Sequence, residues 1–243
     1  MAANAHREHY VFGGYLVTQR VVRPSQMSPE LLPPRLLTAS PCIANCVPDT
    51  WSLDWTTTTD RERQKAAAEL GLDEGTVAAV TSHVTEGFDK SEFGWPNVVT
   101  STEALVGLVK VLPTSREWVA LGLALHRNHL QTFLDENRPP EGAAASGVCQ
   151  LLNQRLSLPP GGTVLGFEPL GFEFGGQPHS WLCNHLEVAC FRALGIRPAA
   201  NGFLETEDDA ERVTAHISSD EVGAEPVLWL PWMILDYTAK SRR

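Results

Sequence analysis

The stretch Val164–Gly195, VLGFEPLGFEFGGQPHSWLCNHLEVACFRALG, decides the fold class of this chain. Its first half is apolar and aromatic, which is typical of a strand, and it runs into the pair Gly175 and Gly176. A helical pattern then begins at Ser180 and ends at Gly195, the residue type that commonly follows a helix C-terminus. We therefore expect a strand, a glycine turn and a helix in direct succession.

Three reactive side chains, His179, Cys183 and His185, lie on or near the first turn of this predicted helix. With Ser180 as the N-cap, Cys183 would be the third helical residue, where free backbone amides and the helix dipole favour a thiolate. A thiolate beside an imidazole is the minimum apparatus for acyl transfer or thiol chemistry. The candidate catalytic residues are Cys183 as nucleophile, His179 as base, and Glu168 or Asn184 to orient the imidazole.

The same cysteine also fits a purely structural role. Cys183, Leu186, Cys190 and Leu194 fall at helical spacing on one face, and buried cysteines usually behave as inert apolar residues. No family-independent motif marks a nucleophilic cysteine. A core position is the simpler interpretation of Cys183, and catalysis is the sharper hypothesis.

Outside this stretch, strands are expected towards both ends of the chain. Residues 9–22, HYVFGGYLVTQRVV, predict a strand that is broken or bulged at its two glycines, and residues 51–55, WSLDW, alternate as a half-buried strand does. Residues 226–237, PVLWLPWMILDY, predict a pair of buried strands around Pro231. The acidic segment 205–211 before them is interpreted as a turn.

The middle of the chain, residues 59–156, has a helical pattern instead. Asp60 or Thr59, Asp73, Ser101 and Ser115 stand where N-cap residues belong. The helices predicted from these caps and from the apolar spacing cover residues 61–71, 74–87, 103–112, 116–137 and 148–156. The segmentation into strands and helices predicts an α+β domain over residues 1–243, with a mixed sheet from the N-terminal strands and the C-terminal third packed against the helical middle. The linker-like segment 138–147, RPPEGAAASG, is the expected subdomain boundary.

Composition narrows the classes of function. The formal net charge of −10 argues against a nucleic-acid binder, because phosphate recognition needs a basic face. No apolar run approaches the ~20 residues that span a bilayer, and the N-terminal MAANAHREHY has no apolar core of the kind a signal peptide requires. We therefore expect a cytoplasmic protein without a membrane segment. The sequence does not indicate its oligomeric state.

Two pairs of side chains have spacings that occur in metal sites. Cys42 and Cys46 are separated by three residues, and His126 and His129 are spaced i, i+3 on a predicted helix that also carries Glu117 and Glu136. Neither pair has an adjacent second pair of ligands, so no metal is predicted. The phosphate-binding and dinucleotide-binding glycine motifs, the serine-hydrolase elbow and the zinc-protease motif are also absent, and no cofactor is predicted.

The missing catalytic signatures favour a protein that acts by binding. Our leading hypothesis is an accessory or immunity-type protein that binds a partner with a basic surface through an acidic, tryptophan-bearing face, since tryptophan is enriched in binding hot spots. The binding residues that this hypothesis selects are Trp181, His185 and Gln177. The alternative is a cysteine-dependent acyl transferase or hydrolase that uses Cys183 and His179.

Overall fold

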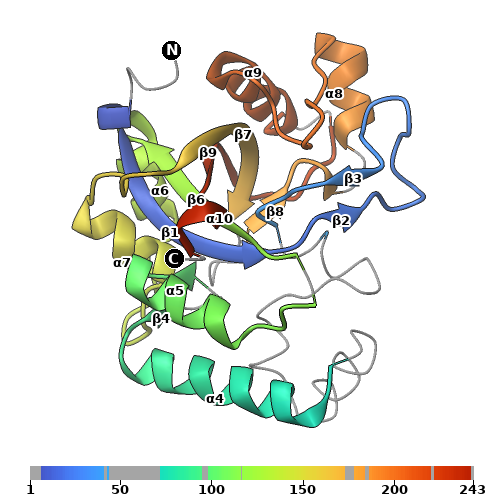
Figure 1. The fold of residues 1–243 in the computed structure, drawn as a ribbon. Coiled ribbons are helices and arrows are strands. Elements are labelled where there is room, and N and C mark those ends of the chain that lie inside the picture. The colour runs from blue at the N-terminus through green and yellow to red at the C-terminus, as the bar shows by residue number, and fades with distance from the viewer. Residues whose placement is uncertain are drawn as a thin grey trace.

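The computed structural model describes residues 7–40, 43, 72–94, 98–115, 117–172, 178–183, 186–219 and 222–241 (Figure 1). Several sequence predictions fall elsewhere in the chain. The strand at 51–55, the helix at 61–71, the cysteine pair Cys42 and Cys46, and three predicted site residues, Gln177, Asn184 and His185, lie outside the described residues.

A seven-stranded antiparallel sheet forms the centre of the molecule, with the strand order β4-β5-β1-β6-β9-β7-β8. Its strands are β1 (Tyr10–Thr18), β4 (Phe93–Gly94), β5 (Val98–Val99), β6 (Val119–His126), β7 (Thr163–Phe172), β8 (Pro178–Ser180) and β9 (Leu228–Asp236). A separate two-stranded sheet pairs β2 (Val21–Val22) with β3 (Arg35–Leu36). The ladder between β1 and β6 shifts register between Phe12 and Gly14, which confirms the bulge predicted at the glycine pair.

The helices of the described residues follow in chain order. They are the short 3-10 helix η2 (Arg7–His9) and the α-helices α4 (Glu74–Asp89), α5 (Thr102–Val111), α6 (Arg127–Glu136), α7 (Gly147–Gln154), α8 (Leu186–Leu194), α9 (Glu207–Ile217) and α10 (Thr238–Ser241). Asp73 and Ser101 cap α4 and α5, as predicted, by accepting hydrogen bonds from Thr76 N and Ala104 N. These caps form within one helical turn, so they are encoded locally.

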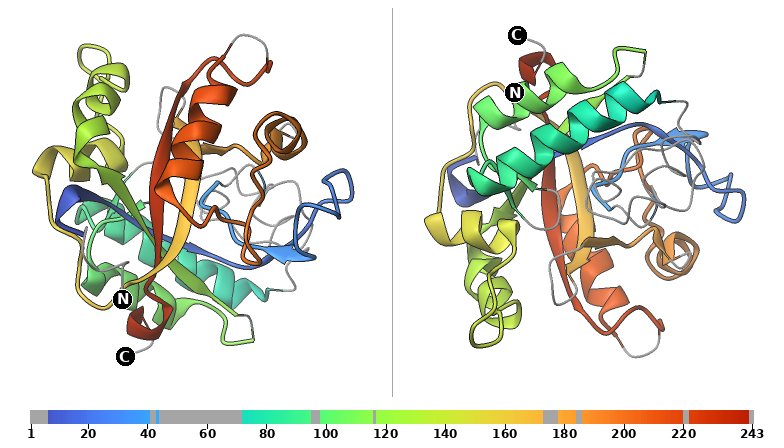
Figure 2. Two further views of the ribbon diagram at one scale, coloured as in Figure 1. Left: turned by 90° about the horizontal axis from the view of Figure 1, so that it is seen from above. Right: turned by 90° about the horizontal axis from the view of Figure 1, so that it is seen from below.

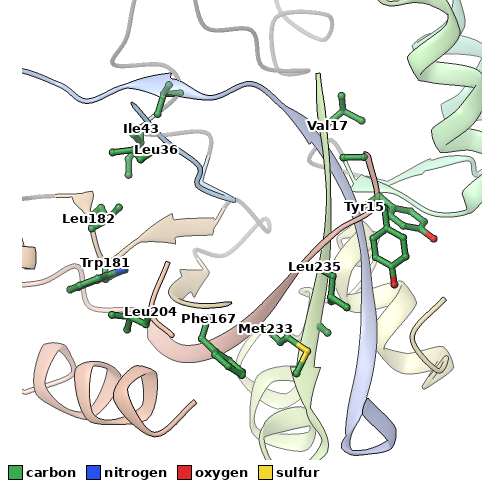
Figure 3. Packing of buried hydrophobic residues seen from close by; sticks show 14 of the residues in the cluster. Tyr15, Val17, Leu36, Ile43, Phe167, Trp181, Leu182, Leu204, Met233 and Leu235 are labelled. Carbon is green, nitrogen blue, oxygen red and sulfur yellow. The ribbon is translucent and has the colours of Figure 1, made fainter. Parts of the chain in front are cut away.

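Both faces of the sheet are buried. Along β9, Trp229, Met233 and Leu235 belong to one apolar cluster, while the alternating Trp232 and Ile234 belong to another. The first cluster is completed by α4, α5, α8 and α9, and the second by α6 and α7. Figures 1 and 2 show α8 and α9 on the opposite side of the molecule from α4 and α5, and Figure 3 shows part of the first cluster between these elements.

The predicted helix over 116–137 is wrong in its first half. Residues 119–126 form β6, and α6 begins only at Arg127. Seven of the eight residues of β6 are buried, because its alternating side chains enter the two clusters on opposite faces of the sheet. A strand covered on both faces has a continuous apolar sequence, which periodicity alone does not separate from a buried helix.

The predicted interruption at Pro231 is also wrong, since β9 continues through it. In the antiparallel register Pro231 lies opposite Pro169 of β7. Neither proline has an N–H, so this rung is one that needs no cross-strand hydrogen bond. The ladder of β9 with β6 ends one residue away at Trp232, and the ladder of β7 with β8 ends one residue away at Leu170. Each proline therefore lies at a position where no neighbouring strand needs a backbone N–H from it.

Two predictions in the C-terminal third also need correction. The helix expected from Ser180 begins at Leu186, because Ser180 is the last residue of β8 and pairs with Leu170. Its predicted end is confirmed, since Gly195 follows α8 with φ +71°. The segment interpreted as an acidic turn instead contains the start of α9, which Thr206 caps.

The fold class is α+β, as predicted: N-terminal and C-terminal strands form one sheet, and helices are concentrated in the middle of the chain. Three short or central strands, β4, β5 and β6, also come from that middle segment. The expected subdomain boundary at 138–147 falls between α6 and α7, which contact each other. Among the described residues, no helix combines the length and the apolar character needed to cross a bilayer.

Candidate functional site

A fully buried carboxyl group, that of Glu168 on β7, is the centre of the candidate site. Thr38 Oγ1 donates to Glu168 Oε1 at 2.7 Å, and the backbone N–H of Ala39 donates to Oε2 at 2.8 Å. The Ser180 hydroxyl on β8 also hydrogen-bonds to the carboxyl group. Glu168 therefore joins the segment that follows β3 to two strands of the main sheet.

The direction of these hydrogen bonds follows from what the hydroxyl oxygens already accept. Thr38 Oγ1 accepts the backbone N–H of Ser40 at 3.0 Å, and Ser180 Oγ accepts the backbone N–H of Leu182 at 3.1 Å. Each hydroxyl hydrogen is then free to point at Glu168. The carboxyl group receives three donors, an arrangement that suits a carboxylate because its oxygens act only as acceptors.

Whereas the three donors favour the ionised carboxylate of Glu168, burial favours its neutral, protonated form. Desolvation raises the pKa of the Glu168 carboxyl above its ordinary value of 4.5, and the hydrogen bonds from Ser180, Ala39 and Thr38 oppose this rise without cancelling it. No charge on a described residue contributes to the shift. The group is thus a buried acid that is satisfied by neutral donors and has no cationic partner in the described part of the chain, an arrangement that is sensitive to protonation.

Cys183 lies at the outer side of this hydroxyl network. Its Sγ is 3.9 Å from Oγ of the buried Ser40, and the cysteine itself is half-buried. Trp181 and Leu182 form a turn after β8, and Cys183 follows it in 3-10 helical geometry, before α8 begins at Leu186. The prediction that Cys183 is the third residue of a helix capped by Ser180 is therefore wrong, since Ser180 ends β8.

The register of β7 and β8 separates two residues that the sequence had combined in one mechanism. Ser180 lies opposite Leu170, on the face of the sheet that also carries Glu168. His179 lies opposite Gly171 and therefore points to the other face. Because the two side chains point to opposite faces, Glu168 cannot orient the His179 imidazole. The hydrogen bonds of Glu168 hold the segment 38–39 instead.

The tryptophan expected at the binding surface is inside the molecule. Trp181 has no exposed surface and packs with Leu182 in the first cluster (Figure 3). The other described tryptophans are also buried: Trp118, Trp229 and Trp232. The tryptophan content, as far as the described residues carry it, therefore serves the core rather than a binding face.

The three described cysteines differ in their surroundings. Cys149 and Cys190 are buried, and Cys183 is half-buried. Burial raises the pKa of the Cys149 thiol, and burial together with the charge of Glu187 raises the pKa of the Cys190 thiol to about 12. The thiolate is the reactive form, so Cys149 and Cys190 are unsuited to nucleophilic chemistry.

His126 and His129 do not share the face of one helix, since His126 ends β6 and His129 lies in the first turn of α6. Their rings are 6.2 Å apart between centroids. His126 Nδ1 already accepts the backbone N–H of Asn128, and His129 Nε2 lies 3.5 Å from Glu211 Oε1. Within the ranges that the structure describes, no group of three or more histidine, cysteine or carboxylate side chains could hold a metal ion.

The acidic residues of the segment 205–211 surround the N-terminus of α9. Glu205, Asp208 and Glu211 are exposed, and Asp208 lies in the first helical turn. Carboxylates in this position are stabilised by the helix dipole. Asp209 pairs with Arg212 on the same helix at 3.3 Å. The N-terminus of α9 thus carries a group of exposed carboxylates.

Sequence reasoning missed Thr38 and Ser40 as members of the site. Thr38 lies 130 residues from Glu168 and Ser40 lies 143 residues from Cys183. The only sequence signal was a glutamate within an otherwise apolar strand, which indicates a buried acid that needs donors but does not identify them. No protein-family model, curated protein or solved structure matches this chain.

Proposed function

We propose that this protein acts in the cytoplasm as an accessory or immunity-type protein that binds a partner protein with a basic surface. The observation that carries the proposal is the exposed acidic group at the N-terminus of α9, formed by Glu205 before the helix and Asp208 in its first turn, with Glu211 three residues further on. The formal net charge of −10 adds a long-range attraction for a basic partner. The tryptophans do not contribute to this surface, because Trp181 and the other described tryptophans are buried.

Helix α9 is suited to present these charges rigidly. Its buried residues Ala210, Val213 and Ile217 belong to the first cluster, so the helix is held by its apolar face against the sheet. Its contacts are with β7, β9 and α8. Because the backbone of α9 is already ordered, only the side chains need to be ordered when a partner binds, which lowers the entropic cost of association.

The matched test compares charge removal at two places. The double variant Glu205→Gln with Asp208→Asn is expected to weaken capture of a partner from the source-cell extract by about tenfold, roughly the effect of losing two interfacial charges. The control, Glu74→Gln with Glu103→Gln, removes the same charge from exposed residues in the first turns of α4 and α5. It should leave capture unchanged.

Salt dependence provides the second criterion for this proposal. Capture that depends on α9 should decline when ionic strength is raised from about 0.05 M to 0.5 M, because added salt shortens the Debye length and screens the charges of the interface. The captured protein must also have a basic surface, as determined after its identification by mass spectrometry. A partner that binds both double variants equally, or that resists salt, contradicts the proposed acidic interface.

A second function, a cysteine-dependent acyl transferase or hydrolase, is favoured by one observation. Cys183 is the half-buried thiol of the described part of the chain, and its Sγ lies 3.9 Å from the Ser40 hydroxyl. In this proposal Cys183 is the nucleophile and His179 the base, while Asn184 orients the imidazole. Glu168 does not orient the imidazole in this proposal, because it lies on the opposite face of the sheet from His179. Its carboxyl group instead holds the segment that carries Ser40.

Thiol labelling distinguishes the two functions. In the native protein Cys183 is expected to react with iodoacetamide at least tenfold faster than Cys149 or Cys190, because these two are buried and burial raises their thiol pKa values. Peptide mass spectrometry over a pH series gives the order. Labelling of Cys183 that persists below pH 7 supports the cysteine-dependent enzyme. Labelling confined to alkaline pH contradicts that proposal and leaves the binding function.

A further inference from the structure

The N-terminus of α6 is capped by a histidine. His126 has extended backbone angles, φ −62° and ψ 139°, and its Nδ1 accepts the backbone N–H of Asn128 at 3.2 Å. Elsewhere in the described chain, the helix caps accept through an oxygen; they are Asp73, Ser101, Ser146 and Thr206. An oxygen cap keeps its lone pairs over the physiological pH range, but an imidazole nitrogen keeps its lone pair only while it is unprotonated.

The surroundings of His126 contain further titratable groups. Its ring centroid lies 6.0 Å from that of His9 on η2, 6.2 Å from that of His129 on α6, and 5.1 Å from that of Tyr10 on β1. Charged groups border this group of rings on three elements: Glu8 beside His9, Arg127 at the start of α6, and Glu207 and Glu211 on α9 beside Tyr10 and His129.

These neighbours do not alter what a proton on His126 does to the cap. A protonated imidazole carries N–H on both nitrogens, so Nδ1 would face the Asn128 N–H as a second donor. The positive charge would also lie at the positive end of the helix dipole. Both effects disfavour the first turn of α6.

We propose that His126 is a pH-dependent cap, and that its protonation releases the first turn of α6 from the end of β6. The contact between His129 and Glu211 responds in the opposite direction, because a protonated His129 forms a full ion pair with α9. Acidification thus shifts the support of α6 from its own N-terminus towards the neighbouring helix. Histidine is the side-chain type that changes charge most readily between pH 5 and 8, which makes a pH series the appropriate test.

Amide hydrogen exchange on the full chain tests the cap directly. The protection factors of Asn128 and Gln131, corrected for intrinsic exchange, are expected to decrease by about fivefold to tenfold between pH 8 and pH 5, the effect of losing an N-cap. The variant His126→Asn supplies a cap that does not titrate and should keep its protection at both pH values. His129→Gln removes the ion pair and should retain the decrease.

Equal protection of the wild type at both pH values overturns the proposal, as does the same decrease in H126N. If H126N does not fold, His126→Ser provides the same control with a smaller oxygen cap. The ¹⁵N shift of His126 Nδ1 gives a second measurement on the wild type alone, since loss of protection must follow protonation of that nitrogen. Loss of protection that occurs while Nδ1 remains unprotonated also contradicts the proposal.

Discussion

Replacing Glu168 by alanine is expected to lower the free energy of unfolding by about 3 kcal/mol, because three buried donors lose their common acceptor. They are the hydroxyl groups of Thr38 and Ser180 and the backbone N–H of Ala39. Urea unfolding followed by circular dichroism measures the change. Thr38→Ser, which keeps the hydroxyl that donates to Glu168 and accepts the Ser40 N–H, should cost only about 1 kcal/mol for the lost methyl group. Similar losses for both variants contradict the role of Glu168 as the common acceptor.

The pH dependence of stability has a definite sign at this residue. Because the folded-state pKa of Glu168 is raised above 4.5, the folded protein binds the proton more tightly than the unfolded chain does. The stabilisation from this proton is complete below pH 4.5 and is lost as the pH rises through the raised folded-state pKa. Glu168→Gln does not titrate, so the free-energy difference between wild type and E168Q should favour the wild type most at low pH.

Measurements of wild type and E168Q in parallel at intervals from pH 4 to pH 8 isolate this residue from all other titrating groups. The advantage of the wild type over E168Q should decrease steadily as the pH rises through the raised folded-state pKa of Glu168. A constant difference would show that the hydrogen bonds cancel the effect of burial at Glu168, and one that favours the wild type increasingly at high pH would show that they outweigh it.

Replacing Trp232 by alanine is expected to cost about 4 kcal/mol, which is the usual range for removing a fully buried aromatic ring. Its ring lies 5.3 Å from that of Phe133 on α6 and 5.0 Å from that of Phe172 on β7, between ring centroids. The indole also fits against Gly13, where a Cβ atom would lie 3.0 Å from the ring. The tryptophan therefore holds α6 and two strands in one packing unit.

The control for this prediction is Leu156→Ala, since Leu156 is one of two large apolar side chains that are exposed in the described residues. It should change the free energy of unfolding by less than about 0.5 kcal/mol. If Trp232→Ala does not fold, Trp232→Phe gives a smaller loss of about 1 to 2 kcal/mol, because a cavity remains beside Phe133. A loss below 1 kcal/mol for W232A would contradict the tight packing of this cluster.

The fold class and several helix caps could be predicted because the signals lie within a few residues. Asp73 and Ser101 each bond to a backbone amide three residues on, so their capping role is visible in the local sequence. The strand β6 could not be identified in this way. Its apolar residues include Leu121, which enters one core, and Ala124, which enters the other, and only the tertiary structure explains why all of them are apolar.

The candidate site was only partly predictable for the same reason. Glu168 and Cys183 could be selected as chemically notable residues, but their partners come from the segment after β3. Ser180 was misinterpreted because serine is an excellent local cap, whereas here strand pairing with Leu170 and the hydrogen bond to Glu168 determine its role. Long-range contacts override a local preference of this size.

The position of β9 in the sheet limits how far the protein can fold during its synthesis. It lies between β6 and β7 in the sheet, yet it is the last of the described strands to leave the ribosome. Until residues 228–236 are synthesised, β6 and β7 each present an unpaired edge on the nascent chain, and such edges invite association with other unfinished chains. Newly made molecules should therefore depend on chaperone protection until residues 228–236 have been synthesised.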